Sequence, residues 1–326
     1  TSTLRRFLRQ GASRYDIDIN RIKTSRQWML DIVREYGNAP AEVGSFQNQR
    51  EALVLALAGA IKKHSIGQRV GTLLIDETQD YLPAEIDIFK RLARRIFAVG
   101  DVKQKIYSGE SPLDAIKSVT GEPKVLEHHH RNGQPICDLA DAVAARDGDY
   151  VPIGGACNYK EEIHGKCVVD RQKCKDLEEQ INRVMDRLRT QLKAFRGQLL
   201  GVMCPTNEET EVVWNAIYNS DLRDKAVLQN SQEGDDFDSD RLICVSTIHS
   251  AKGLEFSAAH IVAAESAVKF GGRARNVYYT AITRARTSLS IYHSEGLPPY
   301  LEQGIVALEP RRQEPTLNDL FSKGGS

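Results

Sequence analysis

Two short apolar segments that end in polar residues constrain the fold of this 326-residue chain more than any other feature. Residues 72–75 lead into an acidic cluster at 76–80, and residues 96–99 lead into a Gly-Asp pair. Between them, residues 82–95 space their apolar side chains as a helix does and end in two arginines. A strand–helix–strand unit of about thirty residues predicts neighbouring parallel strands.

The same alternation recurs later in the chain. Gly121 and Pro123 interrupt the pattern between the first unit and the rest, near residues 118–124. We therefore expect an α/β fold with two parallel-sheet lobes. Further strands are predicted at residues 199–204, 242–246, 259–264 and 289–292, and helices at residues 174–195 and 208–218.

Composition narrows the class of protein. The chain has no run of eighteen apolar residues, and its first residues lack the apolar core of a secretory signal. Lysine plus arginine and aspartate plus glutamate both number 44, so any binding of nucleic acid depends on local patches. Six cysteines in a chain of this size favour free thiols in a reducing compartment, and we expect a cytoplasmic protein.

Asp76 and Glu77 are the first candidate functional residues. Adjacent carboxylates at the carboxyl end of a parallel strand lie where α/β folds bind their ligands. One carboxylate can hold Mg²⁺ on a nucleotide, and the other can orient or deprotonate a water molecule. Acidic residues after a strand are also common in turns, which is the alternative interpretation.

Three further segments carry reactive side chains. In residues 100–107, Gln104 could contact a phosphate and Tyr107 could stack on a base. The alternative interpretation is a polar loop with a packed tyrosine. Residues 247–256 combine a hydroxyl, an imidazole, an ammonium, a glycine and a carboxylate, or they form a capped strand-to-helix connection. Arg284 lies among small residues, and an arginine delivered to a transferring phosphate can raise the rate roughly 10³–10⁵-fold. The alternative is a surface arginine.

Five motifs in order resemble motifs II to VI of the UvrD/Rep family of superfamily 1 DNA helicases. The resemblance covers roughly two thirds of the chain and implies two RecA-like lobes of the P-loop NTPase type, the first of them incomplete. The motifs are Asp-Glu-x-Gln-Asp at 76–80, Gly-Asp-x-x-Gln-x-Ile-Tyr at 100–107, Leu-Glu-x-x-x-Arg at 126–131, Thr-x-His-x-Ala-Lys-Gly-Leu-Glu-Phe at 247–256 and Tyr-x-Ala-x-Thr-Arg-Ala at 279–285.

The resemblance implies a role for each matching residue at a bound ATP. Asp76 would bind Mg²⁺, and Glu77 would activate the attacking water. Gln104 would sense the γ-phosphate, which Arg131 and Arg284 would contact as arginine fingers.

Other matching residues would line the nucleotide or the DNA. Gln79 would link the two sites, and Gly253 and Glu255 would lie at the nucleotide, with Glu255 on the ribose. The residues that the resemblance implies on the DNA side are Tyr107, Thr247, His249 and Lys252.

The phosphate-binding loop of the family is missing from the sequence. The loop reads Gly-x-x-x-x-Gly-Lys-Ser/Thr, and the one Gly-Lys pair, at residues 165–166, lacks both the upstream glycine and the hydroxyl. Either the loop lies upstream of Thr1, or the chain is a degenerate relative. The presence of the residues that serve the loop favours the first alternative. Without a backbone cradle for phosphates, the chain alone should be inactive as an ATPase.

The motifs also set expected domain boundaries. Roughly 115 residues separate Arg131 from Thr247, so the accessory domain that the family inserts there should be reduced or absent. The expected parts are a helical segment at 1–70, the end of the first lobe at 71–120, the second lobe at 121–300 and a tail at 301–326.

The implied function is that of an ATP-dependent DNA helicase or translocase with ATP and Mg²⁺ as cofactors. It would move 3′ to 5′ on single-stranded or partly duplex DNA, in repair, replication or anti-phage defence. The alternative is a non-hydrolysing subunit that keeps the fold to bind DNA or a protein partner.

Overall fold

The computed structural model describes residues 2–12, 15–101, 112–126, 128–144, 151–229 and 241–308. Within these ranges, no helix combines the length and the hydrophobicity that crossing a membrane requires. The six cysteines are free thiols.

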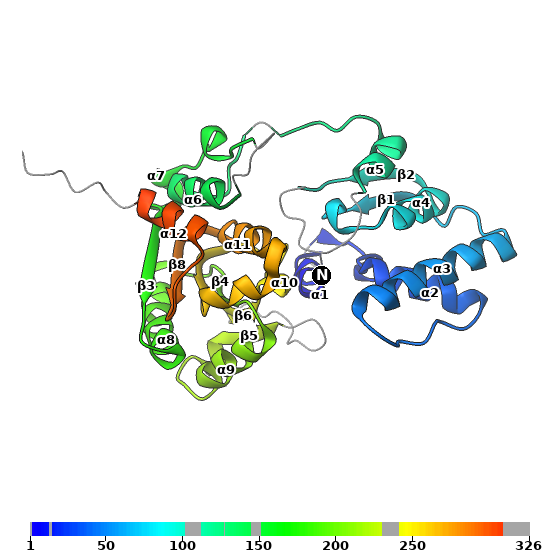
Figure 1. The fold of residues 1–326 in the computed structure, drawn as a ribbon. Coiled ribbons are helices and arrows are strands. Elements are labelled where there is room, and N and C mark those ends of the chain that lie inside the picture. Colours follow the sequence, from blue (N-terminus) through cyan, green and yellow to red (C-terminus); the bar gives the residue numbers. More distant parts are fainter. Residues whose placement is uncertain are drawn as a thin grey trace, which may run out of the picture.

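The first part of the molecule is a two-stranded parallel sheet packed with helices (Figure 1). Strands β1 and β2 pair along their length, with Leu74 opposite Phe97. In chain order the elements are α1 (Ser2–Ala12), η2 (Ile19–Arg21), α2 (Ser25–Tyr36), α3 (Phe46–His64), β1 (Val70–Ile75), η3 (Thr78–Asp80), α4 (Pro83–Leu92), β2 (Ala93–Ala98) and α5 (Leu113–Thr120).

Side chains at the helix starts explain where these helices begin. Thr24 and Ser45 each accept a backbone N–H of the first turn, at the starts of α2 and α3. Pro83 occupies the first turn of α4, where a missing N–H has no effect on the helix. Glu85 reaches back to the N–H of Leu82 at 2.8 Å, which closes the same turn.

Strand β2 begins earlier than the sequence pattern predicts. The helix expected over residues 82–95 ends at Leu92, and Arg94 and Arg95 lie on the strand. The hydrogen bonds that β2 makes with β1 over this length outweigh the helical propensity of the two arginines.

The second part is a six-stranded sheet, all of its strands parallel, in the order β3-β8-β7-β4-β6-β5. The α/β class with parallel sheets is therefore confirmed. The elements are α6 (Gln134–Ala144), η5 (Gly154–Ala156), α7 (Glu161–His164), β3 (Val168–Lys173), α8 (Leu177–Ala194), β4 (Leu200–Cys204), α9 (Asn207–Tyr218), η6 (Arg223–Lys225), β5 (Ala226–Gln229), β6 (Ile243–Thr247), α10 (Ile248–Ala251), β7 (Phe256–Ile261), η7 (Ala264–Arg273), α11 (Ala274–Ile282), β8 (Ala285–His293) and α12 (Pro299–Leu308).

Helices cover both faces of this sheet, as its fully buried central strands require. One core lies between the sheet and α6, α10, α11 and α12, and includes Ile136, Val277 and Leu301. The opposite core lies under α8 and α9, and includes Leu188 and Val213. A third core joins α2, α3 and α4 to the β1–β2 sheet.

Most strands predicted in this part are confirmed. The segments 199–204, 242–246 and 289–292 correspond to β4, β6 and β8, and 259–264 corresponds to β7, which begins three residues earlier, at Phe256. The sequence pattern does not predict β3, which is rich in charge, or β5, which has four residues.

The predicted tail is wrong for residues 301–308. These residues belong to α12, which packs against α6, and Leu301 and Ile305 are buried in the core. Two apolar side chains four residues apart share one helix face, which explains why the segment docks. Residues 309–326 lie outside the described ranges.

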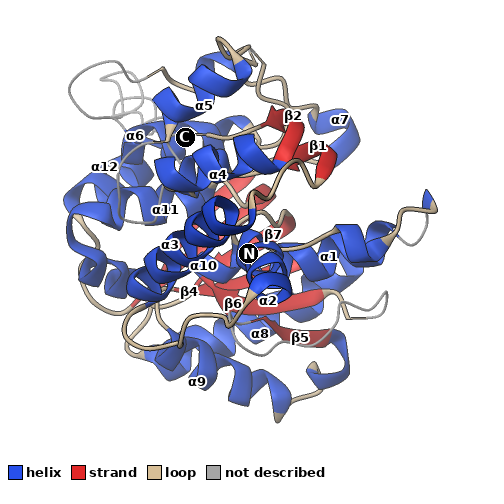
Figure 2. Ribbon diagram, turned by 90° about the vertical axis from the view of Figure 1, so that its right-hand side faces the viewer, coloured by secondary structure: helices blue, strands red, loops and turns tan. Residues whose placement is uncertain are grey.

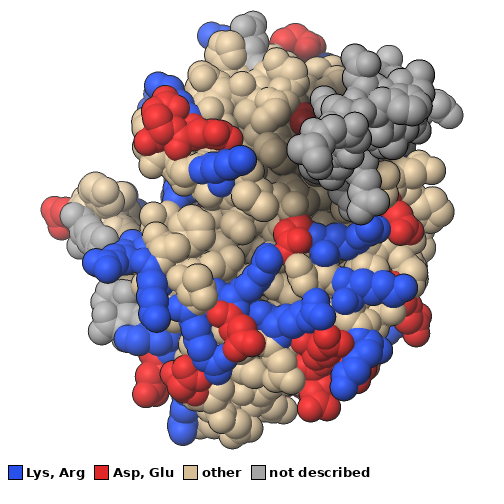
Figure 3. Space-filling view, turned by 90° about the vertical axis from the view of Figure 1, so that its left-hand side faces the viewer, with Lys and Arg blue, Asp and Glu red and all other residues tan. Residues whose placement is uncertain are grey.

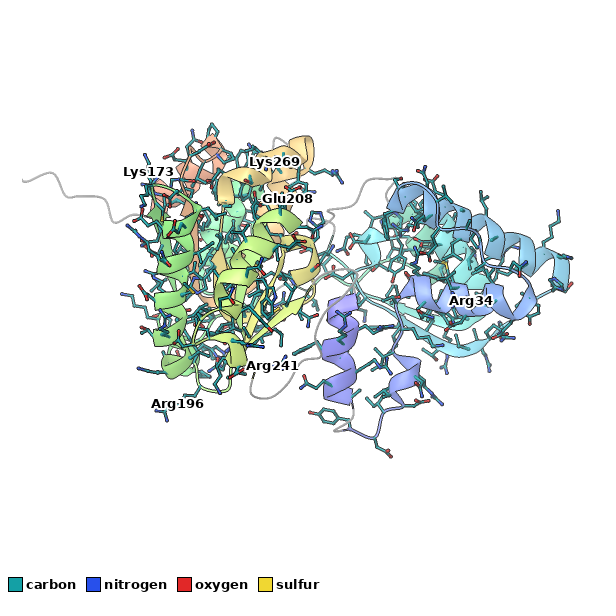
Figure 4. All side chains as sticks on the ribbon, turned by 90° about the horizontal axis from the view of Figure 1, so that it is seen from below. Arg34, Lys173, Arg196, Glu208, Arg241 and Lys269 are labelled. Carbon is teal, nitrogen blue, oxygen red and sulfur yellow. The ribbon has the colours of Figure 1, made fainter. Side chains whose placement is uncertain are left out.

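Helix α1 lies between the two sheets rather than beside the helices that follow it. It packs against α10 of the second part, as Figure 1 and Figure 4 show. Figure 2 looks onto the first part with the six-stranded sheet behind it. Its Leu4 approaches Gly253, and Arg6 donates a hydrogen bond to Gln229 at 3.1 Å.

Candidate active site

Glu77 follows β1 in a strained backbone conformation. Its φ of 52° and ψ of 45° lie in the left-handed region, which costs a non-glycine residue on the order of 1–3 kcal/mol. The carboxylate of Asp76 accepts the N–H of Glu77 at 2.8 Å, which supports this turn. Strain of this kind concentrates at functional sites, and it directs both carboxylates to the carboxyl end of the sheet.

The acidic turn is fixed to the end of β2. The N–H of Thr78 donates to the carbonyl oxygen of Val99 at 3.0 Å. Gln79 donates to Oε2 of Glu77 at 2.5 Å and accepts the N–H of Asp101 at 2.9 Å. A Cβ on Gly100 would lie 2.6 Å from both Gln79 and Thr78, so only glycine lets the two segments approach this closely.

Lys252 reaches the acidic turn from the six-stranded part. Its ammonium lies 2.7 Å from Oδ2 of Asp80 and 3.5 Å from Oε2 of Glu77, and its side chain is only 1% exposed. Burial raises the pKa of Asp80, against the opposing effect of the adjacent ammonium. The residue expected at DNA from the sequence is therefore enclosed by carboxylates of the acidic turn.

Arg50 of α3 bonds both the acidic turn and the start of α4. Its guanidinium donates to both carboxylate oxygens of Glu85, at 3.0 Å to Oε1, and to the carbonyl oxygen of Asp80 at 2.8 Å. Glu85 is buried, so the two-pronged contact compensates a charge that is removed from water.

Arg284 is buried between α11 and β8. Its guanidinium donates to the carbonyl oxygens of Thr280 and Leu254, at 3.1 and 3.2 Å, and approaches the hydroxyl of Thr283 at 3.4 Å. Burial lowers its pKa to about 10, so the group remains a cation at neutral pH. The surface alternative for this arginine is thereby excluded.

Arg131 and Glu255 form an ion pair at 2.6 Å. Both side chains are partly exposed, so solvent screens the pair and its contribution to stability is small. Glu255 is adjacent in sequence to Leu254, whose carbonyl oxygen accepts from Arg284. Two residues that the sequence assigns to the nucleotide are thus in direct contact.

Charged residues of the separate motifs act electrostatically on one guanidinium. The guanidinium of Arg284 experiences the charges of Arg131, Glu77, Glu255 and Asp101, of which the like charge of Arg131 has the largest effect after burial. These residues come from all five of the motifs that the sequence singles out. The fold therefore gathers carboxylates and guanidiniums at one place between the two sheets.

The residues after β6 are engaged in local structure. Thr247 caps α10, because its hydroxyl accepts the N–H of Ser250 at 3.1 Å. The ring of His249 lies 5.1 Å from that of Phe270, and burial lowers its pKa to about 4. Gly253 has a φ of 89°, which favours glycine.

The acidic turn fits a hard divalent cation. Asp76 is exposed beside Glu77, and carboxylate oxygens are the ligands that Mg²⁺ prefers. Within the described part of the chain, no three His, Cys, Asp or Glu side chains are grouped to hold a metal unaided. Mg²⁺ commonly binds through one or two carboxylates together with water and substrate phosphates, and Asp76 meets that requirement.

Two predicted residues, Gln104 and Tyr107, lie outside the described ranges. Two others emerge only from the structure. Asp80 closes the acidic motif, and its partner Lys252 is 172 residues away. Asn132 directly follows Arg131, and its buried side chain contacts the segment around Arg284. Both residues lie next to motif residues in the sequence, which was a signal that could have identified them. Their partners are far away in the sequence, so the contacts themselves could not be predicted.

The outer face of the six-stranded part carries mixed charge. Figure 3 shows Lys and Arg side chains among Asp and Glu on this face. Arg187 pairs with Asp170 at 2.5 Å, and Arg183 pairs with Glu179 at 2.7 Å. Paired charges of this kind describe a solvated surface rather than a basic tract for nucleic acid.

Family models of UvrD-like helicases match two segments of the chain. The UvrD/REP helicase N-terminal domain matches residues 46–109, which include the acidic turn. The UvrD-like helicase C-terminal domain matches residues 242–292, which include Lys252 and Arg284. Arg131 lies between the two matched segments.

Comparison with whole proteins adds two similar structures. No curated protein gives a significant match. The C-terminal domain of a possible DNA helicase from Lactobacillus plantarum WCFS1 is 22% identical, with 53% of this chain and 91% of that chain covered and a TM-score of 0.36. The PRRSV helicase is 17% identical, with 84% of this chain and 48% of that chain covered and a TM-score of 0.37. This chain spans about half the length of the PRRSV structure.

Proposed function

Because this chain belongs to the UvrD/Rep-like DNA helicases, we propose that it forms most of the core of a motor that hydrolyses ATP between its two sheets. The observation that carries the proposal is a connected set of contacts among the motifs. Arg131 pairs with Glu255, Arg284 bonds the carbonyl oxygen of Leu254 before it, and Gln79 joins Glu77 to Asp101. The charges of Glu77, Glu255, Asp101 and Arg131 all act on the buried guanidinium of Arg284. Phosphoryl transfer depends mainly on such positioned charges rather than on covalent chemistry by the protein.

Each group has a role that its surroundings support. Asp76 would hold Mg²⁺, whose charge would offset that of the phosphates when a nucleotide is bound. Glu77 accepts the proton of the attacking water. Gln79 orients the carboxylate of Glu77 through the hydrogen bond at 2.5 Å. Arg131 and Arg284 stabilise negative charge on the terminal phosphate.

The β1–β2 sheet leaves apolar side chains exposed on one face. Leu74 and Phe97 lie opposite each other and are 73% and 61% exposed, although parallel strands are normally buried on both faces. In our proposal a further helix of the same lobe covers this face, and the loop precedes such a helix. Its backbone N–H groups would cradle the phosphates.

Lys252 links the hydrolytic site to the proposed DNA side. Its ammonium cannot contact a DNA phosphate while it is buried against Asp80 and Glu77. A contact with DNA therefore requires Lys252 to leave the acidic turn. The segment that carries Thr247, His249 and Lys252 would in this way connect DNA binding with the surroundings of Glu77, as the motor moves 3′ to 5′.

The proposal is tested by ATPase assays on the full-length protein, with and without single-stranded DNA. We expect turnover that DNA stimulates, and a loss of about 10²-fold or more in Glu77→Gln, since a positioned base typically contributes this much. Glu178→Gln, an exposed carboxylate on α8, is the matched control and should keep full activity.

Absence of turnover in the unsubstituted protein would refute the motor. If that protein still binds single-stranded DNA, a non-hydrolysing binding subunit becomes the better description. Equal activity of Glu77→Gln and Glu178→Gln would instead remove Glu77 from the reaction and leave the motor intact.

A further inference from the structure

Asn132 joins the segments that carry the two arginines. It directly follows Arg131 and is 0% exposed. Its side-chain amide donates to the carbonyl oxygens of Thr283, at 3.1 Å, and of Ala285. Thr283 and Ala285 are the two neighbours of Arg284, so a single amide group brackets that residue.

The orientation of the amide follows from its partners. Carbonyl oxygens only accept hydrogen bonds, so the NH₂ group of Asn132 must face them. Its Oδ1 is then an acceptor, and Nε2 of His129 lies 2.5 Å away. His129 must donate here, which places a proton on its Nε2. Burial lowers the pKa of His129, in agreement with a neutral ring.

The main chain repeats the same junction one residue later. The N–H of Gly133 donates to the carbonyl oxygen of Arg286 at 3.1 Å. A Cβ on Gly133 would lie 2.2 Å from the Cβ of Cys167, so the packing of this residue against Cys167 depends on glycine. The segment after Arg131 is therefore fixed along the segment around Arg284 by both side chain and backbone.

Both guanidiniums are directed at one short stretch of chain. Arg284 donates to the carbonyl oxygen of Leu254 at 3.2 Å, and Arg131 pairs with the next residue, Glu255, at 2.6 Å. Two cations held near each other repel, and the like charge of Arg131 contributes to lowering the pKa of Arg284. A neutral tether is needed to keep their separation constant without adding further charge.

We propose that Asn132 is a positioning residue that holds Arg131 and Arg284 at a fixed separation, so that both can meet one terminal phosphate. This inference rests on the proposed function, in which both arginines contact the γ-phosphate. The alternative is that Asn132 stabilises the fold without any effect on the nucleotide. The two differ in whether a nucleotide with a γ-phosphate is affected more than one without it.

The test compares the affinity of the full-length protein for a fluorescent non-hydrolysable ATP analogue and for fluorescent ADP. We expect Asn132→Ala to lower the affinity for the ATP analogue by about 10–100-fold, because a charged contact is misplaced. The affinity for ADP should change by less than about twofold. Asn132→Asp, which matches the original in size, should behave similarly, because a carboxylate would face two carbonyl oxygens.

Gln180→Ala is the matched control for loss of a buried amide. Gln180 is also 0% exposed, accepts the N–H of Ala263 at 2.8 Å and donates to Ser294 at 3.3 Å. Loss of this amide destabilises the same sheet away from the arginines. The Gln180→Ala variant should therefore have its affinities for both nucleotides lowered by the same factor. If Gln180→Ala changes the ratio of the two affinities as much as Asn132→Ala does, the inference is wrong.

A second measurement does not depend on nucleotide. Nitrogen-15 NMR of the free protein should show His129 with its proton on Nε2, and a proton on Nδ1 would contradict the inference. An unchanged ratio of affinities in Asn132→Ala overturns the role of Asn132 alone. An unsubstituted protein that binds neither nucleotide overturns the proposed function, and this inference with it.

Discussion

The ammonium of Lys252 lies 2.7 Å from the carboxylate of Asp80, which precedes it by 172 residues. This ion pair joins the turn after β1 to the loop after α10, and Glu77 lies within 3.5 Å of the same ammonium. Because a buried cation lies next to two carboxylates, the stability of the junction between the sheets depends on charge. Substitutions at these residues can measure that dependence.

Removal of the ammonium should destabilise the junction. Lys252→Met leaves the largely buried carboxylate of Asp80 without its cation, and we expect a loss of about 3 kcal/mol in the free energy of unfolding. The double variant with Asp80→Asn should recover part of that loss, because the less exposed of the two carboxylates beside the ammonium is then neutral. Urea unfolding of the two single variants and the double variant gives the coupling. Strictly additive losses would show that the two groups do not interact.

Substitution of Gly253 should displace α1. A Cβ there would lie 2.7 Å from Leu4 of α1, in addition to the strain of a φ of 89°. Gly165 has a φ of 87° and nothing within 4 Å, so Gly165→Ala reports the backbone strain alone. We expect Gly253→Ala to cost about 1–3 kcal/mol more than this control. Hydrogen exchange should also be faster in α1 of Gly253→Ala only, and Leu4→Ala should relieve the effect.

The guanidinium of Arg50 should be irreplaceable by an ammonium. Arg50→Met leaves the buried carboxylate of Glu85 without a partner, with an expected loss of about 3–5 kcal/mol measured by urea unfolding. Arg50→Lys should recover only part of it, since lysine cannot make the two-pronged contact. Full recovery by Arg50→Lys would mean that charge alone matters. Addition of Glu85→Gln to Arg50→Met should also restore stability in part.

Acid should destabilise the six-stranded part through His260. Burial lowers the pKa of this histidine to about 3, and its ring bonds Gln191 at 2.7 Å and Tyr292 at 3.2 Å. The unfolded chain takes up a proton below about pH 6.5 whereas the folded chain does not, so stability is lost as pH falls from about 6.5 towards 3.

Substitution isolates this contribution. His260→Gln should be less stable near neutral pH, but its stability should fall less steeply, by up to about 1.4 kcal/mol per pH unit in that window. Urea unfolding between pH 7 and pH 4 measures the slope, and His64→Gln, at an exposed position, controls for the loss of one histidine. An unchanged slope in His260→Gln would assign acid sensitivity to other groups.

Local patterns predicted the parts of the fold that local interactions determine. The run at 72–75 became β1, and the acidic pair follows it at the carboxyl end of a parallel sheet. Helix α9 lies within one residue of the start that its apolar spacing predicts, and the structure shows a capping box of Thr206 and Glu209 there. Charged β3 could not be recognised, since its partner β8 comes much later.

The candidate site was predicted as a set of residues but not as a set of contacts. The motifs name Glu77, Arg131 and Arg284, because residue type and spacing carry that information. The burial of Lys252 against Asp80 and the contact of Asn132 with Thr283 span 172 and 151 residues. Contacts at such separations depend on the assembled fold, and no local preference encodes them.

The pairing of β3 with β8 also has a consequence for the time course of synthesis. Val168 aligns with Ser288, which the ribosome adds 120 residues later. At about 5–20 residues per second, the nascent chain waits roughly 6–24 s before this edge of the sheet can form. During that interval β3 has no neighbour, and its charged side chains at Asp170, Arg171 and Lys173 discourage pairing with another chain. The charges that make β3 difficult to predict from the sequence thus also disfavour its aggregation during synthesis.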